Sequence, residues 1–157
     1  SGHRPMYSSS DLIPGLDLPN GPWWPEVEQL LLKHEVDLCL WGHNHNAEVT
    51  CPLRNGTCAN TTSPNEYGGI VHAIIGNAGQ SLSQFTQGGF DWSMWRFPEF
   101  GYSSIEVNGR KDLTMRFFAD SNHSVVYEFT IQGKNHSNLP SVGVEKKEGH
   151  RRRSSRF

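Results

Sequence analysis

The ten residues Val36-Asp37-Leu38-Cys39-Leu40-Trp41-Gly42-His43-Asn44-His45 place two histidines directly after a short apolar run. The run from Val36 to Trp41 has the length and composition of a buried strand. Gly42 then allows a tight polar turn. Because ligands of α/β sheets bind just beyond the carboxyl ends of the strands, this stretch predicts a ligand site that includes His43 and His45.

A helix is predicted immediately upstream of this strand. Val27, Leu30 and Leu31 follow the i, i+3, i+4 spacing of one helix face, and Pro25 is typical of a first helical turn. We therefore expect a helix from about Pro25 to His34. A helix followed by a buried strand and a polar turn is the order found in α/β layered folds.

Downstream, short strands are expected to alternate with loops. Ile70 to Ile75 has the composition of a second buried strand, while residues 50–69 are predicted to be a polar excursion and residues 81–101 an irregular aromatic segment that caps the core. Turn residues such as Asn108-Gly109 then join three predicted strands of an antiparallel meander: Tyr102 to Val107, Leu113 to Phe118 and Val125 to Ile131.

The histidines are candidate metal ligands. Neutral imidazole binds zinc, iron and manganese, and residues i and i+2 of an extended loop project to the same side. His43 and His45 could therefore reach one site. The alternative is an accidental pair on a surface turn, and the preceding apolar strand favours the ligand interpretation. His3 has no local pattern that distinguishes it from a surface histidine.

Several motifs together resemble one family. Gly2-His3-Arg4-Pro5-Met6-Tyr7, the Gly42–His45 motif, Val71 to Gln80 and Pro98 to Tyr102 resemble the C-terminal portion of purple acid phosphatases, a metallophosphoesterase family, and most closely its large plant-type branch. The resemblance implies that residues 1–131 form the C-terminal part of a metallophosphoesterase domain. The fold class would be α/β, the C-terminal half of an α/β sandwich that ends in the antiparallel meander. Residues 132–157 would be a disordered polar and basic tail.

The resemblance also implies a chemistry. The family holds Fe(3+) beside a divalent zinc, manganese or iron ion, and by resemblance His3 and His43 would bind the divalent ion and His45 the ferric ion. The activity implied is that of an acid phosphatase that hydrolyses small phosphate esters by attack of a metal-bound hydroxide. No catalytic residue beyond these metal ligands is assigned.

The family's remaining ligands come from motifs of the types Gly-Asp-x-Gly, Gly-Asp-x-x-Tyr and Gly-Asn-His, and none of these motifs occurs in the 157 residues. We therefore expect this chain alone to bind at most one divalent ion weakly, to have little phosphatase activity, and to leave a sheet edge and apolar surface uncovered. Two alternatives remain: a nucleotide pyrophosphatase or phosphodiesterase of the same family, and a non-catalytic truncated relative that binds a partner through Phe85 to Phe100.

Cysteines and glycosylation sequons indicate an oxidising compartment. Cys51 and Cys58 enclose a short loop that a disulfide would close, whereas Cys39 lies in the apolar strand and is expected to be buried. Asn-x-Ser/Thr sequons begin at four positions: Asn55, Asn60, Asn122 and Asn135. These features predict a secreted glycoprotein, or one of the secretory pathway, in the extracellular space, cell wall or vacuole.

The composition argues against nucleic acid as the main partner and against a membrane-spanning helix. The chain has 14 basic and 16 acidic side chains and a formal net charge of -2, which argues against nucleic acid as the main partner. The basic run Arg151-Arg152-Arg153 is expected to be a solvated tail. No apolar stretch approaches the roughly 20 residues of a membrane-spanning helix. The sequence gives no indication of the oligomeric state.

Overall fold

The computed structural model of the 157-residue chain describes residues 1–10, 24–59, 68–86, 90–109 and 112–132. These residues form one α-helix and nine strands: α1 (Trp24–Lys33), β1 (Leu38–Trp41), β2 (Ala47–Thr50), β3 (Leu53–Arg54), β4 (Thr57–Cys58), β5 (Val71–Ile75), β6 (Ser93–Phe97), β7 (Gly101–Asn108), β8 (Asp112–Ala119) and β9 (Val125–Gln132). The predicted helix and buried strands are present. The predicted tail, and the sequons at Asn60 and Asn135, lie outside the described residues.

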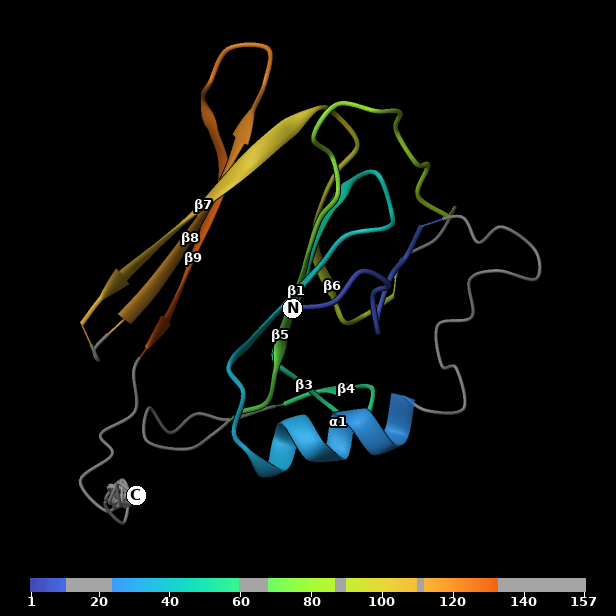
Figure 1. The fold of residues 1–157 in the computed structure, drawn as a ribbon, viewed down its shortest axis with the longest axis vertical. Helices are drawn as coiled ribbons and strands as arrows, with labels where there is room; N and C mark the ends of the chain where they lie inside the picture. The colour runs from blue at the N-terminus through green and yellow to red at the C-terminus, as the bar shows by residue number, and fades with distance from the viewer. Residues whose placement is uncertain (11–23, 60–67, 87–89, 110–111, 133–157) are drawn as a thin grey trace, which may run out of the picture.

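A four-stranded sheet occupies the centre of the described structure, with strand order β1-β5-β2-β6 (Figure 1). β1 runs parallel to β5, with Leu38 opposite Val71, whereas β2 is antiparallel to both β5 and β6. The prediction that residues 81–101 are irregular is wrong at β6. This strand carries aromatic or long side chains on both of its faces, which obscures the alternation by which strands are recognised.

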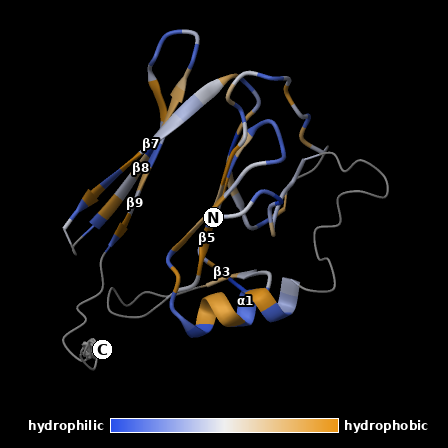
Figure 2. Ribbon diagram, viewed as in Figure 1, coloured by the Kyte–Doolittle hydropathy of each residue, from blue (hydrophilic) through white to orange (hydrophobic). Residues whose placement is uncertain are grey.

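Alternation along these strands divides the core into two layers. On one face, Cys39 and Trp41 of β1 and Ile74 of β5 join a cluster to which α1 contributes Trp24. On the other face, Ala47 and other small or branched residues of β2 and β5 pack against the β7–β9 sheet. The four-stranded sheet therefore lies between the helix and the meander, and the apolar side of α1 turns toward it (Figure 2).

The predicted meander is confirmed. β7 pairs with β8 and β8 with β9, both antiparallel, and the Met115 and Phe117 side chains of β8 are buried against the four-stranded sheet. Ile105 of β7 lies opposite Met115 in the register and so shares its face. It is nevertheless 41% exposed, and Val107 is 63% exposed. The β7 edge of the inner face is thus uncovered by the described residues, as expected from the sequence.

A two-stranded hairpin of β3 and β4 projects beside α1. Its turn is Asn55-Gly56, with φ values of 51° and 75°, which is the combination that a tight hairpin turn requires and that Asn-Gly supplies at low steric cost. The Cys51–Cys58 disulfide closes the hairpin, and Cys39 is free and buried. Both cysteine predictions are therefore confirmed.

Candidate metal site

The first residues of the chain lie along the outer edge of β1. Gly2 forms a parallel bridge with Trp41, its N–H donates to the Leu40 carbonyl at 2.9 Å, and the Gly42 N–H donates to the His3 carbonyl at 3.0 Å. A side chain at Gly2 would not fit, because a Cβ there would lie 2.4 Å from the Trp41 ring. Backbone pairing therefore fixes His3 next to the turn that follows β1.

His43 faces His3 across this turn. Nδ1 of His43 is 3.1 Å from Nε2 of His3, and the two rings meet edge to face with their centroids 5.0 Å apart. The φ of His43 is 63°, in the left-handed region that costs a non-glycine residue about 1–2 kcal/mol. Because of this conformation the loop is not extended at His43, and the simple i, i+2 argument for His43 and His45 does not hold.

The His3–His43 geometry fits two ligands of one ion. Nitrogens that each lie about 2.0–2.1 Å from one ion are about 2.8–3.0 Å apart in octahedral geometry and about 3.3–3.4 Å apart in tetrahedral geometry, and the observed separation of 3.1 Å lies between these values. Both rings are accessible, since His3 is exposed and His43 half-buried. Imidazole nitrogen is a suitable donor for zinc, iron and manganese. Two nitrogens alone leave the ion short of ligands.

His45 lies apart from this pair. Its ring atom Nδ1 is 3.0 Å from the Ser81 hydroxyl, and its backbone N–H donates to the Ser83 hydroxyl at 2.9 Å. Within the described ranges, no three or more His, Cys, Asp or Glu side chains are grouped so that they could hold an ion. The structure thus brings together His3 and His43, 40 positions apart, and places His45 on a separate support.

Gly76, at the end of β5, lets the histidine loop pack closely. A Cβ at this position would lie 2.0 Å from the Asn44 carbonyl oxygen, and the Gly76 N–H donates to the Asn46 carbonyl at 3.2 Å. The loop therefore rests on β5 backbone to backbone. Sequence analysis predicted a strand that ends at Ile75 but did not identify Gly76 as the support of the loop.

A buried polar network that sequence analysis missed holds the first ten residues onto β2. The Glu48 carboxylate, 1% exposed, accepts hydrogen bonds from the Ser9 N–H at 2.9 Å, from the Ser9 hydroxyl and from the Ser93 hydroxyl at 2.6 Å. Asn46 donates to the Ser10 hydroxyl at 2.7 Å. Strand alternation would have placed Glu48 on the face opposite Ala47 and Val49. It could not have shown that the N-terminal segment covers that face.

His72 is packed within the fold. It accepts a hydrogen bond from the Trp41 indole at 3.0 Å, and the two rings are nearly coplanar, with an interplanar angle of 4°. Burial lowers the pKa of His72 to about 3, because an apolar environment penalises the charged imidazolium. His72 is therefore neutral across the physiological pH range.

Comparison with known proteins gives this arrangement a family. Residues 69–128 match the family model described as iron/zinc purple acid phosphatase-like protein C. The chain is 31% identical over 108 residues to a purple acid phosphatase of Arabidopsis thaliana that is named inactive, covering 67% of this chain and 18% of that protein. It is 34% identical over 122 residues to the human acid phosphatase type 7, covering 68% of this chain and 27% of that protein.

A solved structure supports the same assignment. The fold is similar to that of a purple acid phosphatase from yellow lupin seeds, with a TM-score of 0.73, 26% sequence identity, and coverage of 85% of this chain and 24% of that one. The chain belongs to the purple acid phosphatase family, matching its C-terminal portion. It spans about a fifth to a quarter of the length of the curated relatives named above.

Proposed function

We propose that this chain supplies the histidine side of a two-metal centre that hydrolyses phosphate esters as an acid phosphatase. The observation that carries the proposal is the 3.1 Å separation of His3 Nε2 and His43 Nδ1, which matches two ligands of one ion. A pair of metal ions supplies charge neutralisation for the phosphoryl group and activates water as the nucleophile. The chain's own residues position these ions, and carboxylate ligands have to come from outside the 157 residues.

The hydrogen bonds suggest which ring nitrogen of each proposed ligand would face an ion. His3 would bind the divalent zinc, manganese or iron ion through Nε2 and His43 through Nδ1, since these atoms already face each other. His45 would bind the ferric ion through Nε2, because Ser81 occupies Nδ1. A hydrogen bond to one ring nitrogen is the usual way to orient a metal-binding histidine. The separate support of His45 agrees with a second ion.

Two alternatives keep some support. A non-catalytic, truncated relative agrees with the Arabidopsis protein that is named inactive and with the lack of carboxylate motifs in this chain. A nucleotide pyrophosphatase or phosphodiesterase would use the same histidines, so only turnover of different substrates distinguishes it.

The disulfide favours a secreted or secretory-pathway protein, with glycans proposed at the four sequons. The helix among the described residues falls short of what is needed to cross a membrane.

Zinc titration of the chain by calorimetry tests the histidine pair. We expect one weak Zn²⁺ site, and we expect His3→Ala and His43→Ala each to lower its affinity by about tenfold or more. His34→Ala and His123→Ala are matched controls, since both histidines are exposed and neither belongs to the Gly42–His45 loop. His45→Ala should leave this ion unaffected. Equal losses in the control variants would show adventitious binding and refute the pair.

A phosphatase assay tests the need for outside ligands. With p-nitrophenyl phosphate, Fe³⁺ and Zn²⁺ supplied, the 157-residue chain should show little turnover, because its histidines cannot balance two highly charged ions. Robust turnover that depends on His43 would refute this part of the proposal. It would leave the assignment of His3 and His43 as ligands of one ion intact.

A further inference from the structure

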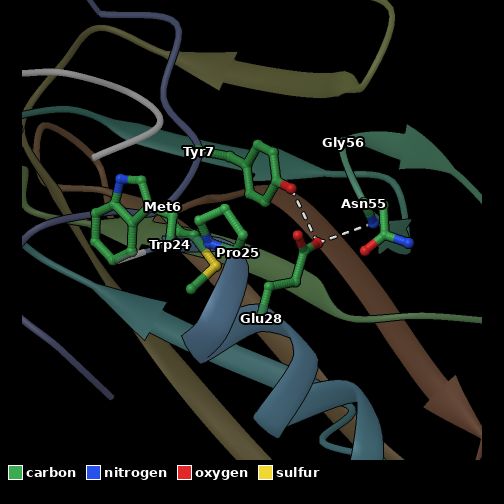
Figure 3. Close-up of a pocket in the computed structure, with 7 residues that line it drawn as sticks. All are labelled: Met6, Tyr7, Trp24, Pro25, Glu28, Asn55 and Gly56. Atoms are coloured by element: carbon green, nitrogen blue, oxygen red, sulfur yellow. Dashed lines mark hydrogen bonds between the residues drawn. The ribbon is translucent and has the colours of Figure 1, made fainter. Parts of the chain in front are cut away.

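A cavity that the histidines do not line lies between the N-terminal segment, the first turns of α1 and the β3–β4 hairpin (Figure 3). Its volume is about 320 Å³, within the usual range of small-molecule pockets. None of the candidate metal ligands contributes to its walls. The lining residues are Met6, Tyr7, Trp24, Pro25, Glu28, Asn55 and Gly56.

Glu28 is the charged group of this cavity. It is 6% exposed, and its Oε1 accepts hydrogen bonds from the Tyr7 hydroxyl at 2.9 Å and from the Asn55 N–H at 3.0 Å. Its Oε2 takes part in neither bond, and Figure 3 shows this oxygen on the side of Pro25 and Met6. Burial and then the bond to Glu28 raise the pKa of Tyr7, so the phenol stays a donor to the carboxylate.

The charge of Glu28 decides which ligands the cavity can accept. The amino-terminal end of a helix attracts anions, and this end of α1 borders the cavity. Glu28 already places a carboxylate in that field, so a second anion would meet a buried like charge. A phosphate ester is therefore excluded from this cavity, and a cation is attracted.

The remaining walls match the body of an organic cation. Met6, Trp24 and Pro25 line the cavity on the side of Glu28 Oε2. Pro25 is exposed, whereas Trp24 and Met6 are 6% and 1% exposed. A hydrated metal ion would gain nothing from these walls, whereas an ammonium on an apolar body satisfies both parts.

We propose that this cavity binds a small organic cation, with its ammonium group on Glu28 Oε2 and its apolar body against Pro25 and Trp24. The competing explanation is purely structural: Glu28 ties α1 to Tyr7 and to the hairpin, and the cavity takes no specific ligand. The two explanations differ in whether charge on a ligand changes its affinity.

A nuclear magnetic resonance titration with three matched probes separates them. Phenethylammonium, 2-phenylethanol and phenylacetate share one apolar body and differ in charge. We expect saturable shifts of the Trp24 indole and of the Asn55 and Gly56 amides with phenethylammonium, an affinity about tenfold or more above that of the alcohol, as one ion pair implies, and no saturation with phenylacetate. Equal behaviour of the three probes, or no saturation with the amine, overturns the proposal.

Two isosteric variants of α1 locate the charge. Glu28→Gln should remove the preference for the amine over the alcohol, whereas Glu26→Gln, which removes the same charge from an exposed position on the same helix, should preserve it. An equal loss in both variants would show that only the general field of the helix acts, and would overturn the site. If Glu28→Gln does not fold, the comparison of the three probes on the unaltered chain decides the question.

Discussion

The β7–β8–β9 meander and the four-stranded β1–β5–β2–β6 sheet differ in the solvent exposure of their carboxylate side chains. In the meander, Arg116 bonds to Glu106 at 2.8 Å and to Glu128, and these side chains are 32%, 67% and 48% exposed. In the four-stranded sheet, the Glu48 carboxylate is 1% exposed and lies 3.8 Å from the Arg96 guanidinium, whose side chain is 25% exposed. The carboxylates of the meander lie on its outer surface, whereas the Glu48 carboxylate of the central sheet is enclosed.

The difference teaches where polar groups hold the candidate site together. An exposed ion pair contributes little, because water solvates both partners almost as well. A buried carboxylate has lost that solvation, so its hydrogen-bond partners become indispensable. Removing it leaves donors unpaired in an apolar environment. The central sheet should therefore be fragile at its polar residues and the meander tolerant at its own.

The largest loss of stability is expected from removing the buried Glu48 carboxylate, and the exposed Glu128 carboxylate of the meander is the matched comparison. Glu48→Ala leaves the Ser9 N–H, the Ser9 hydroxyl and the Ser93 hydroxyl without their acceptor and should lower the free energy of unfolding by about 4 kcal/mol. Glu128→Ala in the meander should cost less than about 1 kcal/mol. Urea denaturation of the two variants measures both values. Similar losses would refute the contrast between the sheets.

A smaller effect is expected from two glycines. Gly76→Ala forces a Cβ to within 2.0 Å of the Asn44 carbonyl, and we expect a loss of about 3 kcal/mol together with weaker Zn²⁺ binding, because the histidine loop must move. Gly109→Ala, at a φ of 61° with nothing within 4 Å, should cost about 1 kcal/mol through backbone strain alone.

Thermal unfolding and zinc calorimetry measure the two consequences. An unchanged zinc affinity in Gly76→Ala would contradict the role of Gly76 as support of the loop. A loss of zinc affinity in Gly109→Ala would contradict the independence of the meander from the histidine site.

The smallest effect at neutral pH is expected from His72→Gln, which keeps an acceptor for the Trp41 indole. Because the folded pKa of about 3 lies below the unfolded value, the unfolded state binds more protons between about pH 6.5 and pH 3. Stability should therefore fall on acidification by on the order of 1.4 kcal/mol per pH unit, and His72→Gln should flatten this slope. His123→Gln, an exposed position beyond β8, should leave it unchanged. Denaturation curves across this pH range measure the slope, and a slope unchanged by His72→Gln would refute the assignment.

Local patterns were sufficient for much of the fold. The helix over Trp24–Lys33, β1, β5 and the three strands of the meander follow from apolar periodicity and turn residues, since each is read within a few positions. β2 and β6 were missed, because Glu48 and Thr50 interrupt the apolar pattern of β2 and the alternation of β6 is obscured by large side chains on both faces. The β3–β4 hairpin was also missed, although its Asn55-Gly56 turn was a usable signal.

The candidate site was predictable in its composition but not in its geometry. Family resemblance selected His3, His43 and His45, yet nothing in the local sequence shows that His43 takes a φ of 63° or that Ser81 holds His45. These features depend on contacts between residues 36 to 40 positions apart. Resemblance also gave no sign of the Glu28 cavity, whose walls come from three separate segments.

By itself, the sequence determined the strand that ends at Trp41, the histidines that follow, and the family to which they belong. Those features reside in short runs, where side-chain periodicity and residue type are sufficient. Only the tertiary structure decided that His3 meets His43, that His45 lies apart, and that Glu48 and Glu28 are enclosed. The reason is physical: backbone pairing between distant segments positions these groups, and burial then determines what each one must bind.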